Sequence, residues 1–153
     1  MRKILRLPDG PETGSAEIEL IALVDLIADP ARHTAAGRAL GVRVAPADKV
    51  EDLGPHLACV AVVAIEFPGP GEGRGYTFAR LLRQRYGFLG EVRAIGPAVK
   101  QDLLFFMFRC GFDAFDLAPD QNLVEARQAL HRFTLAYQPA IPRTAVVEAR
   151  FTA

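Results

Sequence analysis

Continuous apolar runs alternate along this chain with segments in which apolar residues recur at helical spacing. Residues 59–67, CVAVVAIEF, form a run rich in β-branched residues that is continuously apolar up to residue 65, which is typical of a strand covered on both faces. Residues 77–87, TFARLLRQRYG, show helical spacing and end in a glycine, as helices commonly do. The pattern therefore predicts a buried strand followed by a helix.

The same reasoning predicts further elements on both sides of this pair. The other expected strands lie at the start of residues 18–40 and in residues 41–46, 91–96 and 112–118. One further helix is expected after the strand in residues 18–40, and others are expected in residues 48–58, 99–111 and 120–137. Gly54 and Pro55 should shorten or break the helix of residues 48–58, because a proline ring does not fit a helix interior.

Strands that alternate with helices at this spacing indicate right-handed crossovers and a parallel sheet. We predict a single α/β domain over residues 16–138, with three layers and about five mainly parallel strands flanked by helices. A curved half-barrel is the alternative. Residues 1–15 are expected to form an irregular N-terminal arm or a short hairpin, and residues 139–153 a proline-punctuated tail.

Length, charge and hydropathy narrow the classes of function. The 153 residues suit one domain, and 18 basic side chains balance 18 acidic ones, so no bulk nucleic-acid surface is expected. No apolar run approaches the roughly 20 residues of a membrane span. The first residues lack the apolar segment of a signal peptide, which predicts a cytoplasmic protein.

The positions of cysteine and histidine give no sign of a metal or redox centre. Cys59 and Cys110 fit no metal-binding spacing, and His33, His56 and His131 are scattered. Two isolated cysteines also fall short of the thiolates that an iron–sulfur cluster requires. We therefore expect neither a metal nor a cofactor in this chain. If the protein takes part in redox chemistry, the cofactor belongs to a partner.

A glycine-rich loop, EFPGPGEGRGY (residues 66–76), separates the strand of residues 59–67 from the next helix. It matches neither the dinucleotide fingerprint nor the lysine-containing P-loop, so on motif evidence it is more simply a turn in which Gly73 and Gly75 allow positive φ. Its position still suits a small oxyanion, because such ligands bind beyond strand carboxyl ends and at helix N-termini. Arg74 would add charged donors there.

The run GRGYTFARLLRQRYGFLGEVRAIG, followed by RCGFDAFDL and AYQ, resembles a bacterial family known as domain of unknown function 934. The similarity extends from about residue 41 to residue 138. Members of that family commonly lie beside the assimilatory sulfite reductase haemoprotein and are often labelled probable oxidoreductases of sulfite reduction. The resemblance thus implies an accessory role with that haemoprotein. The residues that match the family's motifs are Gly73, Arg74, Gly75, Tyr76, Ala79, Arg80, Leu81, Leu82, Arg83, Arg93, Gly96, Asp102, Cys110, Gly111, Phe112, Asp113 and Phe115.

One departure from the family concerns the start of the helix expected at residues 99–111. The family has a Val-Leu-Arg-Asp-Gln type of opening directly after the strand glycine. This chain has Pro97 and Ala98 there, followed by VKQDL. Whether the change alters the function is left open.

The loop and the family matches together suggest a candidate anion site. The anion-binding candidates are Gly73, Arg74, Gly75, Tyr76, Arg80 and Arg93. The carboxylates expected to support them are Glu66, Asp102 and Asp116. A structural ion pair is the simpler role for Arg93, and packing is the simpler role for Tyr76. The sequence supports two roles for Arg80 equally: binding a ligand at the loop, or lying on the surface without a ligand.

The sequence LLFFMF, residues 103–108, covers every face of a helix with apolar side chains. Burying one side would leave Leu104, Phe105 and Phe108 to be covered. A central helix would explain this pattern. We favour an interface, either with a protein partner such as the sulfite reductase haemoprotein or with a second copy of the chain.

Three functions therefore remain open, and an accessory protein of assimilatory sulfite reduction ranks first. The second is an independent protein or enzyme that binds a small oxyanion, such as sulfite, sulfate or phosphate, through the Gly-Arg-Gly-Tyr loop. The third is a structural dimerisation domain. No nucleophile–base pair stands out, so catalysis is less expected than binding.

Overall fold

The computed structural model describes residues 3–7, 18–34, 39–133 and 140–141, and the structural statements below refer to these residues. Its strands are β1 (Lys3–Arg6), β2 (Leu20–Ala22), β3 (Leu40–Val44), β4 (Val60–Glu66), β5 (Glu91–Ile95) and β6 (Ala114–Leu117). Its helices are α1 (Leu23–Ala28), α2 (Pro30–Thr34), the 3₁₀ helix η1 (Val50–Cys59), α3 (Arg74–Gln84), α4 (Leu104–Arg109) and α5 (Leu123–Leu130).

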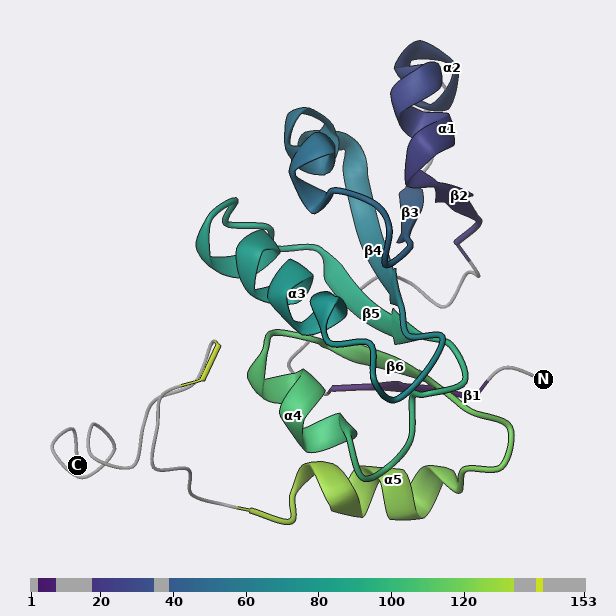
Figure 1. Ribbon diagram of the computed structural model, residues 1–153, viewed down its shortest axis with the longest axis vertical. Helices are drawn as coiled ribbons and strands as arrows, with labels where there is room; N and C mark the ends of the chain where they lie inside the picture. Colours follow the sequence, from purple (N-terminus) through teal and green to yellow (C-terminus); the bar gives the residue numbers. More distant parts are fainter. Residues whose placement is uncertain (1–2, 8–17, 35–38, 134–139, 142–153) are drawn as a thin grey trace, which may run out of the picture.

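The described strands form one open sheet in the order β1-β6-β5-β4-β3-β2 (Figure 1). Strands β2 to β6 are parallel to one another, and β1 pairs antiparallel with β6 at one edge. The predicted fold class is therefore confirmed: one α/β domain with an open, mainly parallel sheet flanked by helices. The five expected strands correspond to β2–β6. Strand β1 lies in the segment expected to be an arm or a hairpin, and its four residues carry too little alternation to predict a strand.

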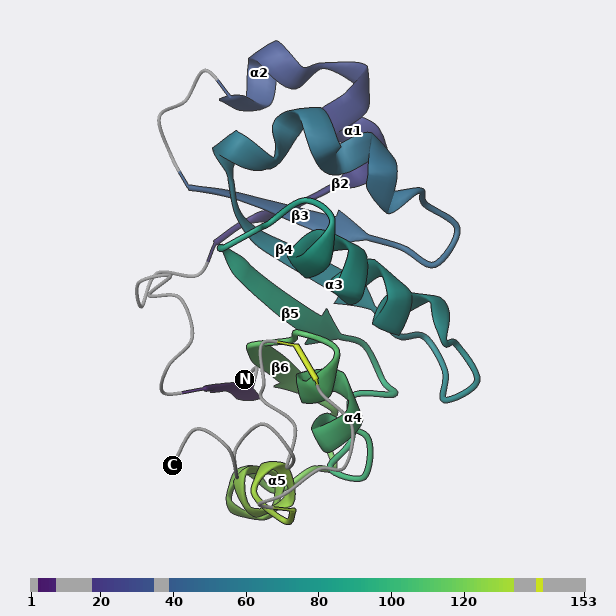
Figure 2. The same cartoon turned by 90° about the vertical axis from the view of Figure 1, so that its left-hand side faces the viewer.

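Strand β4 runs through the middle of the sheet and is buried along most of its length. Helices η1, α3 and α4 lie on one face of the sheet, where Val63 and Ile65 of β4 enter the apolar core (Figures 1 and 2). Helix α3 approaches this face closely at Gly75. A Cβ atom at that position would lie 2.5 Å from the Phe67 ring, so only glycine permits this approach.

Three helical segments differ from their expected limits for local reasons. The helix before β6 begins at Leu104, later than predicted, because the chain first turns after Gly96, whose φ is +111°. The segment before β4 forms a 3₁₀ helix with Pro55 inside it, which agrees with the predicted break. The helix expected after β2 is divided into α1 and α2, and α2 begins at Pro30, a favoured first position for proline.

Arg83, near the end of α3, joins this helix to the segments on both sides of β5. Its Nε donates to the carbonyl oxygen of Gly111 at 3.0 Å. Its Nη1 donates to the carbonyl oxygens of Phe88 and Gly90, at 2.6 and 2.8 Å. Its Nη2 forms an ion pair with the Asp113 carboxylate. One side chain thereby holds together α3, the turn before β5 and the turn before β6.

Candidate functional site

The loop between β4 and α3 contains an ion pair at the position where an oxyanion was expected. Glu72 Oε1 accepts the backbone N–H of Arg74 and its Nε, both at 3.0 Å, and Oε2 accepts Nη2 at 3.2 Å. Through these bonds Arg74 lowers the pKa of Glu72, and Glu72 raises the pKa of Arg74. A carboxylate of the chain itself therefore occupies the donors that the sequence offered to a ligand.

The loop glycines act differently from the expected turn. Positive φ angles in the described chain belong to Gly87, Gly96 and Gly111, so the expectation of positive φ at Gly73 and Gly75 was wrong. Gly73 precedes the first turn of α3 with a φ of −94°. Gly75 is required by the close approach to the sheet, which depends on the size of a neighbouring ring and is not visible in the loop sequence.

Arg74 and Arg80 lie on different sides of α3. Six positions along an α-helix turn the side-chain direction by roughly 120° from the starting point. Arg80 lies close enough to Cys110, at the end of α4, to lower its pKa, whereas Arg74 folds back on Glu72. The structure therefore does not bring these two arginines to one ligand.

Arg93 lies on the face of the sheet opposite to α3. Its neighbours in β5, Val92 and Ala94, belong to the core beneath α3, so Arg93 faces away. Its Nε and Nη2 lie 2.6 and 2.5 Å from Glu91 Oε1, and Glu91 Oε2 accepts Arg6 Nε at 3.0 Å. Arg93 and Glu91 are 2% and 1% exposed. The structural ion pair is thus the role that this geometry supports.

The three carboxylates that were expected to support the arginines lie on different elements. Glu66 ends β4 and Asp116 lies in β6, both half-buried and on the same face as Arg93. Asp102 is exposed in the turn before α4. The carboxylate on Arg93 is Glu91, which the sequence reasoning missed. The available signal was the spacing of two residues within one strand, which places both side chains on the same face.

Tyr76 is held in an aromatic cluster at the start of α3. Its ring centroid lies 5.3 Å from that of Phe67 in an edge-on arrangement, and Phe67 lies 5.7 Å from Phe112. Burial raises the pKa of Tyr76, and the ionised forms of Cys110 and Asp102 would raise it further. Packing therefore accounts for this tyrosine.

Cys110 follows α4 and is half-buried. Burial raises the pKa of its thiol, and this effect exceeds the opposing influence of Arg80 and Arg109. A raised pKa disfavours the thiolate, which is the form that reacts as a nucleophile. The surroundings of Cys110 are therefore those of a structural cysteine.

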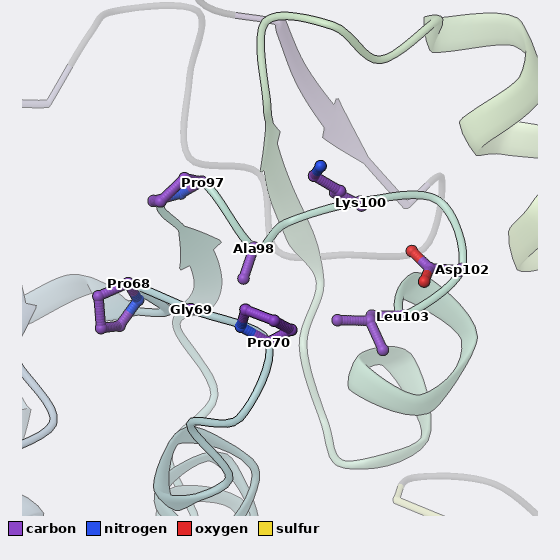
Figure 3. A pocket seen from close by; sticks show the side chains of 8 residues that line it. All are labelled: Pro68, Gly69, Pro70, Pro97, Ala98, Lys100, Asp102 and Leu103. Atoms are coloured by element: carbon purple, nitrogen blue, oxygen red, sulfur yellow. The ribbon is translucent and has the colours of Figure 1, made fainter.

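A cavity of about 240 Å³ lies beyond the carboxyl ends of β4 and β5 (Figure 3). Its lining comes from residues 68–70, after β4, and from residues 97–103, after β5. Gly96 makes this arrangement possible, because a Cβ atom there would lie 2.5 Å from the Phe67 carbonyl oxygen. This edge of the sheet is where α/β proteins commonly bind ligands.

The chemistry of the cavity does not resemble an anion site. Its charged residues are Lys100 and Asp102, one of each sign, and the rest of its lining is apolar: Pro68, Gly69, Pro70, Pro97, Ala98 and Leu103 (Figure 3). Lys100 Nζ lies 3.7 Å from the Asp120 carboxylate. Of the predicted site residues, Asp102 alone lines this cavity.

Helix α4 carries an exposed aromatic surface, but not quite where it was expected. Leu104 is 0% exposed and belongs to the core, so its assignment to an interface was wrong. Phe105 and Phe108 are half-buried, and Phe106 is 54% exposed. The reason is that α4 is only 6 residues long and starts with its first side chain directed inward.

Phe105, Phe106 and Phe133 form what we call the aromatic patch. The ring centroid of Phe105 lies 5.9 Å from that of Phe106 and 5.1 Å from that of Phe133. Phe133, just beyond α5, is 58% exposed. Residues 28 positions apart in sequence thus present one continuous aromatic surface, because α4 and α5 pack against each other.

The sequence pattern of a family described as bacterial protein of unknown function (DUF934) matches residues 41–147. The chain belongs to this family. The match begins at β3 and includes the glycine-rich loop, the cavity and the aromatic patch. No curated protein matches the chain. The family expected from the GRGY and RCGFDAF motifs is therefore confirmed, and its description names no function.

Two further observations concern only the part of the chain that the structure describes. Among its helices, none is both long and apolar enough to cross a membrane. Nor does this part contain a group of three or more histidine, cysteine, aspartate or glutamate side chains placed to hold a metal ion.

Proposed function

We propose that this protein is a cytoplasmic accessory protein of assimilatory sulfite reduction that acts by contact with the sulfite reductase haemoprotein. The link to sulfite reduction rests on the resemblance of the GRGY and RCGFDAF motifs to a family whose members commonly lie beside that haemoprotein. The structural observation that carries the contact role is the aromatic patch, in which Phe106 and Phe133 are 54% and 58% exposed. Exposed aromatic clusters of this kind mark protein contacts.

The arginines support contact over anion binding as the main role. Arg74 is paired with Glu72 and Arg93 with Glu91, so each has a carboxylate of this chain as its partner. Arg80 lies on another side of α3 from Arg74, close to Cys110. An external oxyanion would have to displace Glu72 before it reached the donors of Arg74.

A deletion strain tests the role in sulfite reduction. Cells without the gene should grow poorly on sulfate or sulfite and recover on sulfide or cysteine, because these bypass the reduction of sulfite. A plasmid carrying the wild-type gene should restore growth, and one carrying Phe106→Ser should restore it poorly. The matched control is Leu89→Ser, since Leu89 is 87% exposed and lies before β5. Normal growth of the deletion strain on sulfate, with no second copy of the gene, would refute the proposal.

A further inference from the structure

The cavity beyond β4 and β5 is poor in hydrogen-bond donors. Three of its eight lining residues are prolines, which have no backbone N–H. The N–H groups of Ala98, Lys100 and Leu103 donate to carbonyl oxygens of the chain itself, at 3.2, 3.0 and 3.0 Å. Gly69 and Asp102 are then the lining residues whose N–H groups make no hydrogen bond within the described chain. A ligand that needs many donors, such as a phosphate, does not suit this cavity.

The interior of the cavity is apolar, and its two loops are joined to each other. Figure 3 shows the side chains of Pro70, Ala98 and Leu103 directed toward one another. The N–H of Phe67 donates to the Ile95 carbonyl oxygen at 2.8 Å, and the N–H of Ala98 donates to that of Phe67 at 3.2 Å. Apolar cavities of about 150 Å³ in other proteins bind a benzene ring. The volume of about 240 Å³ therefore suits one ring with a short substituent.

The two charged residues of the lining differ in their partners. Lys100 Nζ lies 3.7 Å from the Asp120 carboxylate, and Figure 3 shows the Lys100 side chain directed away from Pro70 and Leu103. Asp102 is exposed and forms no ion pair within the described chain. The charge without a counter-ion at this cavity is therefore negative, and it favours a ligand that carries a cation.

We propose that this cavity binds a small aromatic amine, with its single ring against Pro70 and Leu103 and its ammonium group paired with the Asp102 carboxylate. Proline rings pack against aromatic rings in the recognition of proline-rich peptides, and three prolines line this cavity. Such a ligand is the opposite in charge of the oxyanion expected at the neighbouring loop. The cavity shares no residue with the aromatic patch, so this site does not rest on the proposed function.

Titration of the full chain with phenethylamine, followed by amide NMR, tests this inference. We expect saturable shifts of residues 69 and 98–103 with a Kd of about 1 mM, the range for so small a ligand. Phenylacetate has the same ring with the opposite charge, and it should bind about fivefold more weakly, the effect of an exposed ion pair. Asp102→Asn should abolish this preference. Lys100→Gln, a matched loss of charge at the same cavity, should not weaken binding of the amine.

Variants of the apolar lining separate binding inside the cavity from binding at the surface. Ala98→Leu fills the space between Pro70 and Leu103 and should abolish the shifts, and thermal melting shows whether this variant is folded. If it is not, Leu103→Ala decides, because the loss of one wall should weaken binding severalfold. No shift at about 10 mM phenethylamine, equal affinity for phenylacetate, or shifts that both lining variants leave unchanged would overturn the inference.

Discussion

Arg83 offers the sharpest test of how this fold is held together. The change is Arg83→Met, which keeps most of the aliphatic stem but removes every donor of the guanidinium. The carbonyl oxygens of Gly111, Phe88 and Gly90 would lose their bonds to Arg83, and the Asp113 carboxylate would lose its counter-charge. The side chains of Arg83 and Asp113 are only 13% and 19% exposed, so water replaces these contacts poorly.

The size of the effect follows from this burial. Removing one partner of a buried ion pair typically costs about 3–5 kcal/mol of unfolding free energy, because the other charge stays buried without compensation. For a chain of this size, each kcal/mol lowers the melting temperature by roughly 2–4 °C, so we expect a fall of about 6–20 °C. Arg83→Lys should recover only part of the loss, because an ammonium group cannot reproduce the planar set of donors.

Chemical denaturation followed by circular dichroism measures this effect. The matched control is Gln84→Ala at the next position, which is exposed and should change stability by no more than about 0.5 kcal/mol. The reasoning is refuted if Arg83→Met lies within about 0.5 kcal/mol of that control. Such a result would mean that the hydrogen bonds of Arg83 contribute nothing beyond what water supplies.

Three further predictions concern single side chains. Gly75→Ala should lower the melting temperature in a thermal scan, because its Cβ atom would lie 2.5 Å from the Phe67 ring; an unchanged value would disprove the close approach. In calorimetry with sulfite or phosphate, the wild-type protein should release no heat and the Glu72→Ala variant should bind weakly, because Glu72 occupies the donors of Arg74. Equal binding by the two proteins would show that Glu72 does not compete with the anion. The Asp113 carboxyl should titrate by NMR above the ordinary aspartate value of about 3.9, because burial raises its pKa. Asp113 then contributes most to stability below the ordinary aspartate pKa, and this contribution is lost as pH rises through its pKa in the folded protein. An NMR titration midpoint below the ordinary value would contradict the prediction.

Much of the fold was open to prediction because its signals are local. The β-branched run of β4 and the periodic apolar positions of α3 each specify one element within about ten residues. Alternation of such elements then implies a parallel sheet through the handedness of crossovers. The edge strand β1 escaped because its pairing with β6 joins residues more than 100 positions apart, such as Ile4 and Asp116.

The candidate site was harder to predict because it depends on which side chains meet. The sequence pointed to Arg74, but it did not show that the nearby Glu72 folds onto its guanidinium. Only part of the aromatic patch could be predicted from the sequence, for the same reason. The apolar run of α4 indicated an exposed surface, whereas Phe133 joins that surface only through tertiary packing. Composition identifies residues that need partners, and the fold decides which partners they find.

Direct titration of the purified chain with purified sulfite reductase haemoprotein tests the central claim most directly. The account predicts a saturable complex in calorimetry at low salt, weakened about tenfold or more by Phe106→Ser and unchanged by Leu89→Ser. No binding of the folded wild-type protein at about 100 μM would contradict the account, and so would binding that Phe106→Ser leaves unchanged.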